Sequence, residues 1–215
     1  QHIEENPSVS ELSKSLFQLG HEHEIDGNIL DMEFTPNRGD CLSINGLLRD
    51  LAAFYTVELN HEKYTKEIDS LSLDFVNLSD GICPKISFLK LEVDQIPEVY
   101  HDFLDNYFLD LGVNKNNFFT DVSNYLSYET GQPTHCYDAK KIGSKFVFHE
   151  IESDEEFETL HGKKVTLTGK NAVFSMNNKV VNLAGVVGGK STSCSASTKT
   201  VMIECAFFQP EAIIG

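Results

Sequence analysis

The strongest constraint on the fold is a series of short apolar runs that follows Asp138. They read KFVFHEI, KKVTLTG, AVFSM, KVVNLAGVV and TVMIECAFF, and turns such as HGKK and MNNK separate several of them. Short runs rich in β-branched and aromatic residues are typical of strands, and tight turns between them are typical of antiparallel neighbours. The last part of the chain therefore predicts a β meander.

Helical patterns come before this β-rich part. Residues 8–20 have apolar residues at helical spacing, and Ser8 and Glu11 form a capping-box pattern at their start. The run ILDMEF alternates like a strand, and Ser43 is placed to cap a second helix. These three elements predict a small helix–strand–helix unit at the N-terminus.

The chain as a whole predicts an α+β fold with two parts. Residues 63–82 show no single period, and we interpret them as a connector between residues 1–62 and the rest. The run ISFLKLEVDQI then alternates as a strand, and Pro97 is expected to open a helix that Gly112 closes. This strand, this helix and the meander predict a larger mixed α+β domain over residues 83–215.

Composition excludes several classes of function. A net charge of -16 argues against an extended surface that neutralises phosphates, and no apolar run approaches the roughly 20 residues of a membrane span. The five cysteines form no CxxC pair, and their odd number argues against a disulfide framework, so reduced thiols and a cytoplasmic location are expected. His21 and His23 are two residues apart, which suits a strand edge or a loop better than a helical metal pair.

Two segments combine a turn with polar side chains. In FTPNRGDCLSINGLLRDLAAF, each polar residue has a local role, and Arg38 and Arg49 can pair with carboxylates, so a helix-capping turn is the favoured interpretation. In GQPTHCYD, the turn delivers His135 in a fixed direction, downstream of the short polar side chains of Ser123 and Asn124. Residue chemistry alone leaves both a structural and a catalytic role open for this histidine.

Two further segments lie in the meander. LAGVVGGKSTS has glycines that allow close backbone approach, and their amides could hold an oxyanion or phosphate, although a glycine-rich β corner explains them equally well. TVMIECAFF carries Glu204, and strand alternation places it on the same face as Met202 and Ala206. A carboxylate there either faces solvent or lies in a pocket with a specific partner, because burying it alone is costly.

Taken in order, five motifs resemble the β-subunit of bacterial phenylalanyl-tRNA synthetases: TPNRGDCLSINGLLRDLA, DVSNYLSYETGQPTHCYD, ETLHGKKVTL, NLAGVVGG and ECAFFQPEAI. The resemblance implies that the chain is a fragment of such a subunit and that residues 83–215 are its B3/B4 domain. In that family this domain hydrolyses the ester of tyrosine wrongly attached to tRNA(Phe). The implied partners are the 3′ end of tRNA(Phe) carrying tyrosine, the synthetase α-subunit and the remaining β-subunit domains. No metal or organic cofactor is implied.

The resemblance also assigns roles to residues. His135 matches the family's editing histidine, which positions the ester or a water together with Asn124, and Glu204 matches the glutamate that recognises the tyrosine hydroxyl. The remaining matches are substrate-binding residues of the same pocket: Ser123, Ala184, Gly185 and Gly188. We therefore expect one cleft to be lined by Ser123, Asn124, His135, Gly188 and Glu204.

Departures from the family pattern keep two other functions open. GHEHEIDGNILDMEF replaces the inserted tRNA-binding OB-fold of the family, and no class II catalytic motif is visible, so this chain is not expected to synthesise aminoacyl-tRNA. A non-catalytic module for subunit interaction would keep the fold without the hydrolysis. A stand-alone relative that binds another aminoacyl-tRNA is the other alternative.

Overall fold

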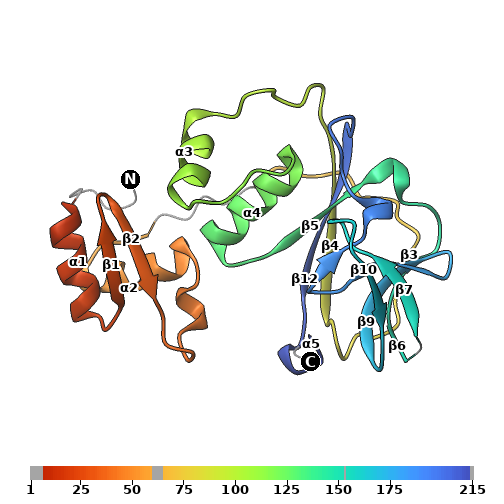
Figure 1. The fold of residues 1–215 in the computed structure, drawn as a ribbon, viewed down its shortest axis with the longest axis horizontal. Coiled ribbons are helices and arrows are strands. Elements are labelled where there is room, and N and C mark those ends of the chain that lie inside the picture. Colours follow the sequence, from red (N-terminus) through yellow and green to blue (C-terminus); the bar gives the residue numbers. More distant parts are fainter. Residues whose placement is uncertain (1–6, 60–64, 153, 214–215) are drawn as a thin grey trace. The chain divides into compact units, whose positions relative to one another are not determined.

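The computed structural model describes residues 7–59, 65–152 and 154–213 (Figure 1). The chain forms two compact units, and each unit is assembled from three separate segments. Unit 1 comprises Gln1–Ile68, His101–Asn114 and Tyr125–Gln132, and unit 2 comprises Asp69–Tyr100, Lys115–Asn124 and Pro133–Gly215. The sequence-based boundaries, 1–62, 63–82 and 83–215, remain a prediction about domains. Within the described ranges, no helix combines the length and apolar character needed to cross a membrane.

Unit 1 begins with helix α1 (Val9–Gln18), strands β1 (Glu22–Asp26) and β2 (Ile29–Glu33), and helix α2 (Ile44–Tyr55). The predicted caps are confirmed. The Ser8 side chain accepts from the backbone N–H of Glu11 and the Glu11 carboxylate accepts from that of Ser8, while the Ser43 side chain accepts from Gly46. Leu16 and Leu51 form the buried centre between the two helices, and the two strands form an antiparallel hairpin.

The helix expected to start at Pro97 begins later. Helix α3 runs over Asp102–Asp110, and Val99 lies outside it with 76% of its surface exposed. Two carboxylates in the first turn, Asp102 and Asp105, favour this start because they stabilise the positive end of the helix dipole. The prediction from Pro97 is therefore wrong about the start, whereas Gly112 with φ +63° does follow the helix.

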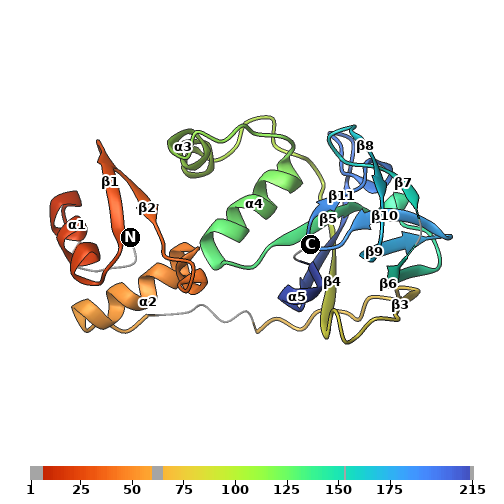
Figure 2. The same cartoon turned by 60° about the horizontal axis from the view of Figure 1, so that its bottom comes forward.

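Unit 2 contains two main sheets (Figures 1 and 2). The three-stranded sheet has β12 (Thr200–Phe207) at its centre, between β4 (Lys85–Glu92) and β5 (Thr134–Asp138), and both pairings are antiparallel. The five-stranded sheet has the order β11 (Val187–Gly188), β10 (Lys179–Leu183), β9 (Asn171–Met176), β6 (Phe146–Ile151) and β3 (Phe75–Asn77). Strands β7 (Glu155–Glu158) and β8 (Lys164–Leu167) form a separate hairpin, and α5 (Pro210–Ile213) follows β12.

This arrangement confirms the predicted α+β class, and it confirms the predicted meander only for β9, β10 and β11. The last predicted run, β12, instead pairs with β4 and β5 in the other sheet. Each predicted run contains a strand, but β1, β5, β7 and β11 were not predicted as strands. Residues 63–82 do more than connect, since they supply β3, which pairs in parallel with β6. That strand is only three residues long, so it leaves no periodic signal in the sequence.

The core of unit 2 joins the two main sheets. Its buried members include Tyr137 and Met202 from the three-stranded sheet, and Phe146, Phe148 and Phe174 from the five-stranded sheet. The opposite face of β5 contacts helix α4 (Phe118–Thr130), where Ser123 bonds the Thr134 hydroxyl and the Cys136 thiol donates to the carbonyl of Phe119. Because side chains alternate along a strand, the residues between, His135 and Tyr137, face the core.

Candidate functional site

The site is built on one cross-strand row of the three-stranded sheet. Glu204 of the central strand β12 is directly opposite His135 on β5 and directly opposite Phe88 on β4. Side chains that are directly opposite in an antiparallel pair lie on the same face, with Cβ atoms about 5 Å apart. The register therefore places the histidine beside the glutamate, although they are 69 positions apart in the chain.

A second cross-strand row, in the five-stranded sheet, forms the other side of the candidate site. There Asn182 of β10 is opposite Phe174 on β9 and opposite Gly188 on β11. The Asn182 amide reaches Tyr137, and Gly188 packs against His135, so the two rows meet in the core. We refer to His135, Tyr137, Asn182, Gly188 and Glu204 as the core polar cluster.

Glu204 is held by a buried hydrogen-bonded chain. Its side chain is only 5% exposed, and its Oε2 accepts a hydrogen bond of 2.6 Å from the Tyr137 hydroxyl. That hydroxyl in turn accepts from Asn182 Nδ2 at 2.7 Å. As alternation predicted, Glu204 shares its face with Met202, which is buried, and with Ala206, which packs against the core.

Burial controls the charge of Glu204. Removal from water raises the pKa of this carboxyl to about 7, although the hydrogen bond from Tyr137 opposes the rise. Burial, together with the neighbouring carboxylate, raises the pKa of Tyr137 well above its usual value, so the phenol keeps its proton. Near neutral pH, Glu204 therefore exists in both protonated and ionised forms, whereas Tyr137 remains a hydrogen-bond donor.

His135 is a neutral imidazole with an unused nitrogen. Burial lowers its pKa to about 4, so it carries no charge at pH 7. Its ring meets the Tyr137 ring edge-on, with centroids 4.4 Å apart. Its Nε2 is out of contact with solvent and has no hydrogen-bond partner among the described residues. Buried polar atoms are nearly always partnered, which makes this nitrogen a candidate ligand contact.

Gly188 makes room for that imidazole. A Cβ built on Gly188 would overlap the ring at Cε1 and would lie 2.6 Å from Nε2, closer than real contacts allow. The absence of a side chain at this position therefore lets the β11 backbone approach the edge of His135 that carries the unused nitrogen.

The other predicted site residues lie elsewhere in unit 2. Ser123 bonds Thr134, whose side chain is on the face of β5 opposite to His135, and Asn124 is half-buried next to it on α4. Ala184 is 2% exposed within the core, and a Cβ on Gly185 (φ +71°) would meet Phe208 and Ile213. Of the expected cleft residues, these contacts join His135, Gly188 and Glu204. The functional roles of all seven predicted residues remain predictions.

Tyr137 and Asn182 were not singled out from the sequence. Alternation in THCYD is a signal that could have found Tyr137, since it places that residue on the same face as His135. Asn182 stands between Val181 and Leu183, and a polar residue in such a run is a weak sign of a buried hydrogen bond. Neither signal indicates the partner, because the partner depends on how the strands pair.

Unit 1 contains a polar cluster of a different kind. His21, Cys41 and Asp50 offer ligand atoms within 4.8 Å of one another, a set of residue types that binds metals in other proteins. However, the Arg38 guanidinium donates to Asp50 at 2.6 Å and to the Cys41 sulfur at 2.8 Å, so a cation already neutralises the group. Arg38 also pairs with Asp40, as the turn interpretation predicted. The cluster is best explained as a structural support for the turn before α2.

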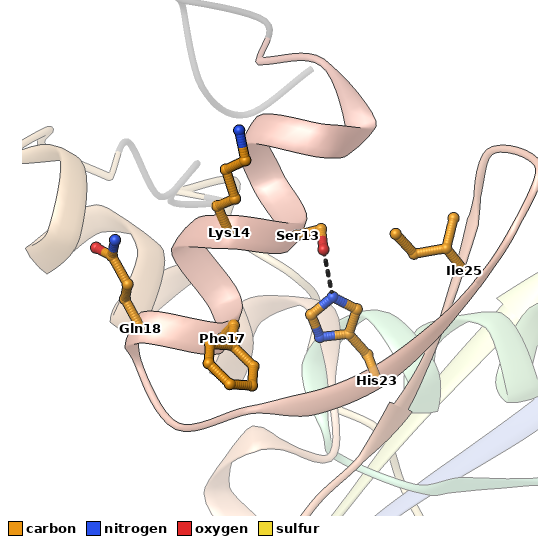
Figure 3. A pocket seen from close by; sticks show the side chains of 6 residues that line it. All are labelled: Ser13, Lys14, Phe17, Gln18, His23 and Ile25. Carbon is orange, nitrogen blue, oxygen red and sulfur yellow. Dashed lines mark hydrogen bonds between the residues drawn. The ribbon is translucent and has the colours of Figure 1, made fainter.

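Unit 1 also has an open hollow between α1 and β1, with a volume of about 350 Å³ (Figure 3). Figure 3 shows His23 pointing toward the helix, where its Nε2 bonds the Ser13 hydroxyl at 2.8 Å. The hollow is lined by Ser13, Lys14, Phe17, Gln18, His23 and Ile25. None of the predicted site residues lines it, and the aromatic ring of Phe17 is largely exposed beside it.

The fold and the core polar cluster define a class: an α+β domain with a buried carboxylate, a phenol and a neutral histidine between two sheets. Residues 98–215 match the family model described as the B3/4 domain. This match covers more than half of the chain, and the chain belongs to the B3/4 domain family.

Two curated relatives with the same name illustrate the similarity. The chain is 30% identical over 224 residues to the phenylalanine–tRNA ligase beta subunit of Wolbachia sp. subsp. Brugia malayi, with 95% of this chain and 28% of that protein covered. It is 33% identical over 194 residues to the subunit of the same name from Ehrlichia canis, with 86% and 24% covered. The chain therefore spans about a quarter of the length of these relatives. The resemblance to this family, first indicated by the five motifs, is confirmed.

A solved structure is also similar. It is an N-terminal fragment of the phenylalanyl-tRNA synthetase beta-subunit from Pyrococcus horikoshii, with 15% sequence identity and a TM-score of 0.49. The similarity covers 96% of this chain and 65% of that one.

Proposed function

We propose that this chain carries the editing site of a phenylalanine–tRNA ligase β-subunit and hydrolyses the ester of Tyr-tRNA(Phe). The observation that carries the proposal is Glu204, a buried carboxylate that accepts a hydrogen bond from a phenol and lies opposite His135 in the same row. The environment of Glu204 is thus already suited to a phenolic hydroxyl, the one group that distinguishes tyrosine from phenylalanine.

Selection for tyrosine follows from the cost of an unpaired buried acceptor. The hydroxyl of a bound tyrosine would gain a hydrogen bond with Glu204 Oε1, the oxygen that Tyr137 does not use. A bound phenylalanine would leave Oε1 without a partner. Leaving a buried acceptor unpaired costs about 1–3 kcal/mol, which corresponds to about 5- to 150-fold in rate. A pocket shaped only by apolar contacts could not separate the two amino acids to this extent.

His135 acts by position rather than by charge. Since its pKa is lowered to about 4, the imidazole is neutral, and its Nε2 is available to hydrogen-bond the ester or the attacking water. The water oxygen adds to the ester carbonyl carbon, the bond to the ribose oxygen breaks, and the proton passes to that ribose oxygen. The products are free tyrosine and tRNA. The Gly188 backbone lies at the same edge of His135, and Asn124 remains a predicted contributor.

The first test compares two substrates. In the full-length subunit assembled with its natural partners, release of tyrosine from Tyr-tRNA(Phe) is expected to be faster than release of phenylalanine from Phe-tRNA(Phe). Glu204→Ala is expected to lower the ratio of the two rates about 10-fold, because the hydroxyl loses its acceptor. Deacylation of purified substrates by single-turnover kinetics measures both rates.

Glu156→Ala is the matched control, since this carboxylate is exposed on β7 and should leave the ratio unchanged. Equal release of tyrosine and phenylalanine by the wild-type assembly would overturn the editing proposal. Background rates for every variant would instead favour a module that serves only subunit interaction.

A further inference from the structure

Tyr137 is built into the core in a way that serves Glu204. Tyr137 faces Met202 in the strand register, two positions from Glu204, so its side chain reaches the carboxylate along the diagonal between neighbouring strands. Its ring is 0% exposed and packs edge-on against both His135 and Phe146, with centroids 4.4 and 5.5 Å apart. The ring therefore has little freedom to turn away from the carboxylate.

The hydrogen bonds of the Tyr137 hydroxyl are directional. The hydroxyl has one proton, which it donates to Glu204 Oε2, and it accepts from the Asn182 amide. Asn182 thus orients the phenol, and the phenol fixes one oxygen of the carboxylate. Only Oε1 of Glu204 remains for a hydroxyl of another molecule.

We infer that Tyr137 is a specificity-determining positioning residue, which occupies one oxygen of Glu204 so that the other is aimed at the hydroxyl of the substrate tyrosine. This inference rests on the proposed function and adds the residue that sets the geometry and charge of the selecting group. Asn182 supports this role indirectly, because its amide orients the Tyr137 hydroxyl. Neither residue needs to touch the ester.

The hydrogen bond from Tyr137 also affects the pH at which Glu204 ionises. It lowers the pKa of the carboxyl against the effect of burial, so removing the Tyr137 hydroxyl is expected to shift ionisation of Glu204 to higher pH. The other titratable groups in this environment are His135, which is opposite in the register, and the thiols of Cys83 and Cys136, both of which respond to the charge of Glu204. Burial raises the pKa values of both thiols to about 11 or 12, and His135 is neutral above about pH 5, so Glu204 alone titrates between pH 6 and 9 within this group.

The test is Tyr137→Phe in the full-length assembly. The ratio of tyrosine to phenylalanine release is measured from pH 6 to 9 after subtraction of spontaneous ester hydrolysis. In the wild type the ratio should rise with pH through a midpoint near 7, as Glu204 ionises and its Oε1 becomes a charged oxygen that only accepts. In Tyr137→Phe the midpoint should move up by about one pH unit, which lowers the ratio about five-fold at pH 7 and restores most of it at pH 9. A purely structural defect would lower the ratio at every pH.

Tyr55→Phe is the matched control, because it removes a hydroxyl that bonds Ser15 in unit 1 and should change neither ratio nor midpoint. If Tyr137→Phe does not fold, Asn182→Leu tests the same chain of hydrogen bonds and should move the midpoint in the same direction by less. An unchanged midpoint and ratio in a folded variant would overturn the inference while leaving the editing proposal intact. A wild type without preference for tyrosine would overturn the editing proposal itself.

Discussion

Glu204→Gln is expected to stabilise the 215-residue chain by about 3 kcal/mol at pH 8 and by much less at pH 4.5. The carboxyl has a pKa of about 7 in the folded protein against an ordinary value of 4.5. A group whose folded pKa is raised binds its proton more tightly in the folded state. Its contribution to stability is therefore complete below pH 4.5 and is lost as the pH rises to about 7, by about 1.4 kcal/mol per unit of difference. Glutamine keeps the shape and the acceptor for Tyr137 but has no charge to bury.

The contribution of His135 to stability changes with pH in the opposite direction, and the unfolding experiment must take this into account. Its pKa is lowered from 6.5 to about 4, so its contribution to stability is present above pH 6.5 and is lost as the pH falls toward 4. In the wild type the two trends oppose each other between pH 4.5 and 6.5. In Glu204→Gln only the histidine trend remains, and stability should rise with pH across this window.

Urea unfolding of both proteins at half-unit steps from pH 4.5 to 8 measures the difference. Glu156→Gln is the control, since it changes an exposed carboxyl in the same unit. A difference between Glu204→Gln and wild type that stays constant over this range would show that Glu204 is not buried in its charged form.

Local signals predicted much of the fold. Capping residues and apolar spacing were sufficient for α1 and α2, and alternation was sufficient for the strands of the meander. Two of the strands that were not predicted, β1 and β7, have the sequences EHEID and EEFE, in which apolar residues are too few to mark a face. Those strands are stabilised by pairing with a neighbour, which a single sequence does not contain.

From residue chemistry alone, the candidate site was predictable only as separate residues, and only the family resemblance implied that they share one cleft. His135, Gly188 and Glu204 came from motifs, but their proximity depends on the register of β5 with β12 and of β10 with β11. Tyr137 and Asn182 were not predicted as site residues for the same reason. Their importance lies in hydrogen bonds that form only when the two sheets face each other.

Gly188 and Gly189 are adjacent, but a side chain at Gly188 would disturb the candidate site, whereas a side chain at Gly189 would disturb the fold. A Cβ on Gly188 would strike the imidazole of His135, which is a side chain rather than backbone. A Cβ on Gly189 would strike the backbone oxygen of Val181 and lie 2.9 Å from Cε2 of Phe157, in a place where Gly189 N already donates to that oxygen. The first clash can be relieved by moving one imidazole, whereas the second requires the β10 backbone or the core to move.

Gly188→Ala is therefore expected to lower tyrosine release by the full-length assembly about 100-fold, to the level of His135→Ala, because a catalytic group displaced by about 1 Å costs about that much. Its effect on stability should be smaller than that of Gly189→Ala, because the clash is with one side chain rather than with backbone. Gly189→Ala is expected to destabilise the 215-residue chain by about 3 kcal/mol, since overpacking against fixed atoms is costly. Urea unfolding and single-turnover deacylation of both variants measure the two effects. Wild-type deacylation by a folded Gly188→Ala protein would mean that His135 does not act from the position it occupies beside Glu204, and the hydrolytic role would then have to be assigned to another group in the core polar cluster.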